Sequence, residues 1–68
     1  MKKKLIINGE KIFVLAETLS KVLNEINIIK KKNIAVAVNE EVIEKTNWES
    51  YKIKTGDIIE IVQPLKGG

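Results

Sequence analysis

A chain of 68 residues with a net charge of +3 has room for one domain around one small core. It contains neither cysteine nor histidine, which removes disulfides, the commonest general base and the best ligands for soft metals. We therefore expect a protein that is not a self-contained enzyme, binds no metal or cofactor of its own, and folds on apolar packing, for which a hydrophobic content of 44% suffices.

Three lysines, Lys2 to Lys4, open the chain and resemble the basic start of a signal peptide. The apolar run behind them stops at Asn8-Gly9, which is far too short for a signal-peptide core or a membrane span. We expect a soluble, cytoplasmic protein. All twelve basic residues are lysine, whereas specific readers of nucleic acid favour arginine, so the lysine clusters at 2–4 and 30–32 are most simply solvated surface.

Residues 4–8 and 11–15 are predicted to form a β-hairpin. Asn8-Gly9 between them favours a type I′ turn, because that turn needs positive φ at both central positions. A two-residue turn pairs Ile7 with Glu10. This register divides the apolar residues between two faces: Leu5, Ile7, Ile12 and Val14 towards the core, and Ile6 and Phe13 away from it.

An amphipathic helix is predicted to begin after Thr18, whose hydroxyl can accept a hydrogen bond from an unpaired backbone N–H. Apolar residues then recur at helical spacing: Leu19, Val22, Leu23 and Ile26. The pattern covers two to three turns, so the helix must be held by packing on a sheet. Residues 30–33 are predicted as a solvated connection.

Residues 34–38 alternate large and small side chains with period two and are predicted to form an interior strand. Ile34, Val36 and Val38 would face the core, whereas Ala35 and Ala37 would make the opposite face smooth and shallow. A turn over residues 39–41 then leads into a short strand at 42–43.

Thr46 is predicted to cap one helical turn over residues 48–51, with Trp48 closing the edge of the core. Thr55-Gly56-Asp57 is a second strong turn signal. The last strand is predicted over residues 58–63, and Pro64, which cannot donate to a ladder, ends it.

The order strand, strand, helix, strand, short strand, strand predicts an α+β domain: one mixed sheet with the helix on one face. Residues 1–68 are predicted to form a single domain, in which residues 64–68 are a flexible C-terminal tail. The tail ends in Leu65-Lys66-Gly67-Gly68. A Gly-Gly end has no Cβ atoms and is thin enough to enter a narrow active-site tunnel, and its carboxylate is unhindered.

This order of elements with a terminal Gly-Gly resembles the β-grasp, ubiquitin-like sulfur carriers, and within them the ThiS-type carriers of thiamine biosynthesis. The resemblance covers nearly the whole chain. It rests on Ile7-Asn8-Gly9, on Ala37-Val38-Asn39 with Val42-Ile43, on Trp48-Glu49, and on Gly56-Asp57-Ile58-Ile59-Glu60-Ile61-Val62 leading to Gly67-Gly68. Glu40 stands where this family often has glycine. Pro64 is more typical of molybdopterin-synthase small subunits, whereas Trp48 and the short length are typical of ThiS.

The resemblance implies that Gly68 is the sulfur-bearing residue. An E1-like adenylyltransferase of the ThiF type would use ATP to adenylate its carboxylate, and sulfur from a cysteine desulfurase relay would convert it to a thiocarboxylate. A thiazole synthase of the ThiG type would then take the sulfur to build the thiazole ring. Gly67, Lys66 and Leu65 would enter the partner's active site.

A carrier of this kind needs a docking surface beside its tail. We expect Val62, Ala35 and Ala37 to supply it, together with Leu65, because Val62 faces away from the core side of its strand by period-two alternation. Each of these residues taken singly is also compatible with ordinary protein surface.

Other functions remain open at this point. Among carriers, the chain could be the small subunit of molybdopterin synthase, whose tail would sit in a larger catalytic subunit. A ubiquitin-like modifier and a carrier for amino-acid biosynthesis are further alternatives. From a different class, a nucleic-acid-binding β-grasp module would lose affinity steeply with salt and would not depend on Gly68.

Overall fold

The computed structural model describes residues 2–26 and 34–63, which form a five-stranded sheet, an α-helix and a short 3₁₀ helix. The elements in chain order are β1 (Lys3–Ile7), β2 (Glu10–Val14), α1 (Leu19–Glu25), β3 (Ala35–Val38), β4 (Glu41–Ile43), η1 (Lys45–Asn47) and β5 (Ile58–Val62). The strands lie in the order β2-β1-β5-β3-β4. Strands β1 and β5 are parallel, and the other neighbours are antiparallel. The predicted α+β, β-grasp architecture is confirmed.

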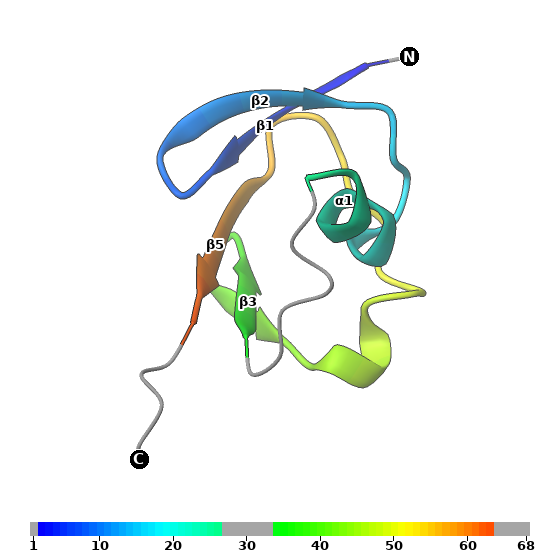
Figure 1. The fold of residues 1–68 in the computed structure, drawn as a ribbon, viewed down its shortest axis with the longest axis vertical. Coiled ribbons are helices and arrows are strands. Elements are labelled where there is room, and N and C mark those ends of the chain that lie inside the picture. The colour runs from blue at the N-terminus through cyan, green and yellow to red at the C-terminus, as the bar shows by residue number, and fades with distance from the viewer. Residues whose placement is uncertain (1, 27–33, 64–68) are drawn as a thin grey trace.

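One face of the sheet packs against α1. Figure 1 shows β1 and β2 above the helix and β3 and β5 to its left, so that the sheet bends around it. The core between sheet and helix contains the thirteen buried apolar residues Leu5, Ile7, Val14, Ala16, Leu19, Val22, Leu23, Val36, Val38, Ile43, Trp48, Ile53 and Ile59. The other face of the sheet is therefore left for solvent or for a partner.

The first hairpin has the register that its turn chemistry predicts. Ile7 pairs with Glu10, and Leu5 pairs with Ile12. Asn8 and Gly9 have φ of 50° and 82°, so both central residues lie where a type I′ turn requires them. The predicted division of faces is confirmed as well, since Leu5, Ile7 and Val14 are buried whereas Phe13 is 55% exposed.

Helix α1 is held by its cap and by the segment after η1. The Thr18 hydroxyl accepts from the Lys21 N–H at 3.3 Å, which confirms the predicted cap. The N–H groups of Leu19 and Ser20 donate to backbone carbonyls of Tyr51 and Trp48, at 2.9 and 3.0 Å. Two donors that the first helical turn leaves unpaired are thus satisfied by a loop. A helix of seven residues is consequently fixed in place by tertiary contacts rather than by its own propensity.

The segment after β4 differs from its prediction. The helical turn is a 3₁₀ helix at Lys45–Asn47, its N-cap is Glu44, and no side chain caps it, so the prediction that Thr46 caps a turn over residues 48–51 is wrong. The reason is Trp48, which is buried as predicted and donates its indole N–H to the Ile43 carbonyl at 2.9 Å. That bond ties Trp48 back to the end of β4, and the residues between them fit only a short 3₁₀ turn.

Two further predictions lie outside the described residues: the connection at 30–33 and the tail at 64–68. Elsewhere the strand boundaries shift by one residue from those predicted, as in β4, which begins at Glu41. In the part of the chain that the structure describes, no helix is both long and apolar enough to cross a membrane.

Candidate functional site

The face of the sheet that α1 does not cover carries an apolar surface, which we call the outer face. It comprises Ile6 of β1, Phe13 of β2, Ala35 and Ala37 of β3, Val42 of β4, and Ile58 and Val62 of β5. The exposed fractions are 55% for Phe13, 70% for Val42, 51% for Ile58 and 57% for Val62. Four large apolar side chains on one side of a small sheet are more than the scattered exposure of ordinary surface.

Strand β5 shows how the outer face arises. Ile59 is fully buried beneath the helix, whereas its neighbours Ile58 and Glu60 are exposed, as the period-two alternation of a strand requires. Val62 lies two residues beyond Glu60 and is therefore on the same outer face. A strand with one apolar face in the core and apolar residues on its other face is typical of a strand covered from both sides.

The structure brings the three predicted docking residues together. Ala35 pairs directly with Val62, and Ala37 lies two residues along β3 from Ala35 on the same face. Ala35 is exposed and Ala37 is half-buried. The placement of Val62, Ala35 and Ala37 on one surface beside the end of β5 agrees with the prediction, while their contact with a partner stays a prediction.

The outer face extends further than predicted. Val42 pairs with Ala37, and Ile58 pairs with Ile6. The alternation that placed Val62 outwards also places Ile58 outwards, so that signal was present in the sequence. Val42 had a weaker signal, because a strand of three residues has too few positions to show a period.

Charged residues lie among the apolar side chains of this face. Lys4 pairs with Phe13, Lys11 with Ile6, and Glu60 with Ala37. All three charged residues are exposed. Lys4 and Lys11 lie on β1 and β2, and Glu60 lies on the central strand β5. An exposed apolar surface of this kind is a candidate for contact with another protein.

The four predicted tail residues, Leu65, Lys66, Gly67 and Gly68, lie outside the described residues. The strand that leads to them is β5, which lies in the centre of the sheet between β1 and β3. The last described residue is Gln63, directly after β5. Any group beyond Gln63 is therefore attached to the most central element of the fold and follows directly from the outer face.

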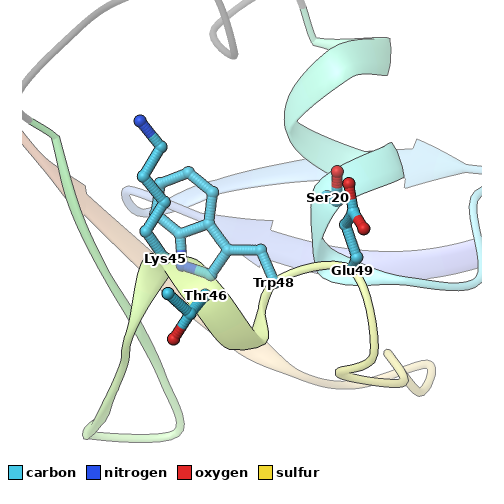
Figure 2. A pocket seen from close by; sticks show the side chains of 5 residues that line it. All are labelled: Ser20, Lys45, Thr46, Trp48 and Glu49. Carbon is cyan, nitrogen blue, oxygen red and sulfur yellow. The ribbon is translucent and has the colours of Figure 1, made fainter.

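A pocket of about 350 Å³ lies on a different part of the molecule, and its lining is Ser20, Lys45, Thr46, Trp48 and Glu49. Figure 2 shows Lys45 on one side of the Trp48 indole and Ser20 and Glu49 on the other. Both charged side chains are exposed, so water competes with any ligand for them. The described residues contain no group of three or more Asp and Glu that could hold a metal ion. The outer face is the stronger candidate site.

Comparison with protein families gives one match that covers almost the whole chain. A model described as the ThiS family matches residues 5–68. No curated protein matches the chain.

Solved structures similar to this chain include thiamine biosynthesis proteins and a subunit of molybdopterin-converting factor. The crystal structure of thiamine biosynthesis protein ThiS from Geobacter metallireducens has a TM-score of 0.81 at 26% identity, covering 96% of this chain and 99% of that one. An NMR structure of a thiamine biosynthesis protein from the same organism has a TM-score of 0.73 at 24% identity, covering 96% and 87%, and supports the fold alone. A complex of subunits 1 and 2 of molybdopterin-converting factor from Helicobacter pylori 26695 contains a chain with a TM-score of 0.57 at 27% identity, and both chains are covered completely.

Proposed function

The chain belongs to the ThiS family and is a ubiquitin-like sulfur carrier, and we propose that it carries sulfur as a thiocarboxylate on Gly68 for the thiazole ring of thiamine. The observation that carries the proposal is the family match, which runs from Leu5 to Gly68 and so includes the Gly67-Gly68 end. Its similarity to a thiamine biosynthesis protein over nearly the full length of both chains supports the pathway.

Activation begins with a poor electrophile, because the negative charge of a carboxylate repels nucleophiles. A carboxylate oxygen of Gly68 attacks the α-phosphorus of ATP, which forms an acyl-adenylate and releases pyrophosphate. A persulfide sulfur, supplied through a cysteine desulfurase, then attacks the acyl carbon and displaces AMP. A thiol cleaves the resulting acyl disulfide at its sulfur–sulfur bond, which leaves the thiocarboxylate on Gly68 and a new disulfide on the donor side.

In this proposal the carrier supplies a docking surface and a C-terminal carboxylate, and its partners supply the catalytic groups. The outer face docks against a ThiF-type adenylyltransferase and later against a ThiG-type thiazole synthase, while Leu65, Lys66 and Gly67 enter the active site. Gly67 suits a narrow tunnel because it has no side chain. No side chain of residues 1–66 takes part in bond making, and ATP is bound by the activating partner rather than by this chain. The protein is accordingly a co-substrate and not a catalyst.

The small subunit of molybdopterin synthase is a second candidate. The observation that favours it is the complete mutual coverage with a chain of the molybdopterin-converting factor complex, together with Pro64. The higher TM-score of the ThiS structure, 0.81 against 0.57, favours the thiamine pathway. The two candidates share the activation step and differ in the enzyme that consumes the sulfur.

The test is sulfur transfer to the intact protein. We expect incubation with ATP, a ThiF-type partner, a cysteine desulfurase and cysteine to replace one oxygen of the carrier with sulfur. Mass spectrometry of the intact protein and of its C-terminal peptide measures the replacement and locates it at Gly68. A thiazole synthase and a molybdopterin synthase large subunit, offered separately to the loaded carrier, distinguish the two pathways.

Two variants serve as controls for this experiment. Deleting Gly68, or extending the chain beyond it with a tag, should abolish sulfur loading while the thermal unfolding midpoint stays within about 4 °C, because changes outside the core typically alter stability by less than about 0.5 kcal/mol. Equal loading of a tagged or Gly68-deleted protein contradicts the proposal.

A further inference from the structure

Strand β5 is paired over unequal lengths on its two sides, over four residues with β3 and over two with β1. On one side β3 accompanies it to its end, where Ala35 pairs with Val62. On the other side the pairing with β1 ends at Ile7 and Ile59, because the chain then turns back at Asn8-Gly9. The second half of β5 would therefore present an open edge on the β1 side, next to the residues that lead to Gly68.

The side chain of Asn8 closes this edge. Its Nδ2 donates to the carbonyl of Ile61 at 3.2 Å, and its Oδ1 accepts from the N–H of Ile61 at 2.8 Å. Both main-chain groups of one β5 residue are thus bonded to a single amide. Ile61 is seven residues before Gly68 in the sequence.

The geometry continues the ladder between β1 and β5. The N–H of Ile6 donates to the carbonyl of Asp57 at 3.1 Å, and the N–H of Asn8 donates to the carbonyl of Ile59 at 2.9 Å. The acceptors of a parallel ladder on one strand are two residues apart, so the carbonyl of Ile61 is the next acceptor after those of Asp57 and Ile59. The chain has turned away there, and the primary amide, which has a donor and an acceptor like a peptide group, takes that place.

A matching contact holds the other end of β5. Asn39 has φ of 51° in the second hairpin turn, almost the same as Asn8 in the first. Its Oδ1 accepts from the N–H of Ile58 at 3.0 Å, and its Nδ2 donates to Asp57 Oδ1 at 3.1 Å. The two asparagines have the same side chain and nearly the same φ, but Asn39 binds the start of β5 and Asn8 binds its end.

We propose that Asn8 is a positioning residue for sulfur loading: its side-chain amide fixes the end of β5 at Ile61, and thereby the place from which the chain continues to Gly68 when the activating enzyme is bound. This role rests on the proposed function. It assigns to Asn8 a role beyond turn formation, since glycine at the same position would also adopt a positive φ but has no side-chain amide to bind Ile61. Asn39 has no such role, because it binds the strand far from the tail.

The experiment compares Asn8→Gly with Asn39→Gly. Glycine suits the backbone of both turns, so each variant leaves the hairpin. Asn8→Gly removes both side-chain hydrogen bonds to Ile61, and Asn39→Gly removes one to Ile58 and one to Asp57. Two quantities are measured: amide hydrogen exchange at Ile61 and Ile58, and steady-state adenylation by a ThiF-type E1-like enzyme with ATP, followed as pyrophosphate release. We expect Asn8→Gly to speed exchange at Ile61 and to lower kcat about tenfold or more, since a misplacement of about 1 Å can cost about 100-fold in rate.

KM should change little in Asn8→Gly, because the outer face that docks the partner is intact. Asn39→Gly should speed exchange at Ile58 and leave kcat within about twofold of the wild-type value. Urea unfolding of each variant gives its folded fraction under the assay conditions, and a difference in kcat that remains after correction for this fraction is not a stability effect.

The outcomes separate this role from the function it rests on. Wild-type protein that is not adenylated overturns the proposed function, and the positioning role with it. Adenylated wild-type protein with equal kcat for the two variants overturns the positioning role alone. If Asn8→Gly does not fold, Asn8→Asp takes its place, because aspartate keeps the turn and the acceptor but loses the donor to Ile61. A wild-type kcat in Asn8→Asp then overturns the role.

Discussion

At the scale of single residues, the second hairpin turn contains a conformation that its sequence does not suit. Glu40 has φ of 71°, in the left-handed region, and Asn39 precedes it at 51°. Asparagine tolerates this region, whereas for glutamate it costs about 1–2 kcal/mol. The ThiS family often has glycine at this position, and glycine adopts positive φ without strain. Glu40 is exposed, so nothing in the core compensates for it.

We therefore expect Glu40→Gly to stabilise the protein by about 0.5–1 kcal/mol. Relief of the left-handed strain outweighs the extra freedom that glycine gives the unfolded chain, which costs about 0.4–1 kcal/mol. Urea unfolding at equilibrium measures the change. Glu41→Gly is the matched control: it lies one residue on, in β4, and should destabilise by about 0.5–1 kcal/mol. Equal losses in both variants would show that Glu40 is not strained.

Residue chemistry predicted one turn fully and the other only in part. Asn8-Gly9 identifies a type I′ turn by itself, and the register of β1 with β2 follows from it. Asn39-Glu40 contains no glycine, so the sequence indicates a turn but not its left-handed geometry. The contact of Asn8 with Ile61 could not be predicted, because its partner lies 53 residues away and the contact depends on the parallel pairing of β1 with β5.

At the scale of elements, α1 is a helix that is stabilised by its packing on the sheet and by its hydrogen bonds to a loop. Leu19, Val22 and Leu23 have no exposed surface and face the sheet, which confirms the predicted apolar stripe. The start of the helix was predictable because Thr18 is a local signal. The form of η1 was not, since the bond between the Trp48 indole and the Ile43 carbonyl sets it.

Leu23→Ala should lower the free energy of unfolding by about 2–5 kcal/mol, because truncating a fully buried leucine leaves a cavity between helix and sheet. Lys21→Ala, in the same helix but exposed, should change it by less than about 0.5 kcal/mol. Urea unfolding of the two variants side by side gives both values. A loss below about 0.5 kcal/mol in Leu23→Ala would remove Leu23 from the core.

At the scale of the whole molecule, helix and outer face give the sheet two different sides. One side is closed by α1 and contains the core, and the other presents apolar side chains to solvent. Alternation along β3 and β5 predicted Val62, Ala35 and Ala37 on the outer side. The register of the first hairpin predicted Ile6 and Phe13 away from the core, and alternation along β5 also places Ile58 outwards. Val42 became apparent only when cross-strand pairing brought it beside Ala37.

If the outer face docks the partner, a charge introduced on this face should weaken binding to the partner, whereas a charge introduced elsewhere should not. Val62→Asp should weaken binding to a ThiF-type partner about tenfold or more, because a buried, unpaired carboxylate costs more than the 1.4 kcal/mol that corresponds to tenfold. Isothermal titration calorimetry measures this affinity. Stability should change by less than about 1 kcal/mol, since Val62 is 57% exposed.

Leu15→Asp is the matched control for this change. Leu15 is 60% exposed and follows β2, which places it at the end of the sheet opposite to Val62. We expect its substitution to leave the affinity for the partner within about threefold of the wild-type value. Binding energy is concentrated in a few residues near the centre of an interface, and Leu15 lies far from Val62. Similar losses of affinity in both variants would argue against the outer face as the docking surface.

The parallel pairing of β1 with β5 also governs the order in which the fold can be completed. The first and last strands of the described chain are central neighbours, and each hairpin is joined to the rest of the sheet only through β5. Contacts between such distant segments make folding slow relative to a chain of local contacts. A ribosome has to release almost the whole domain before the two hairpins can join. A prematurely terminated chain therefore lacks the middle of its sheet rather than an edge, and cannot display the complete outer face.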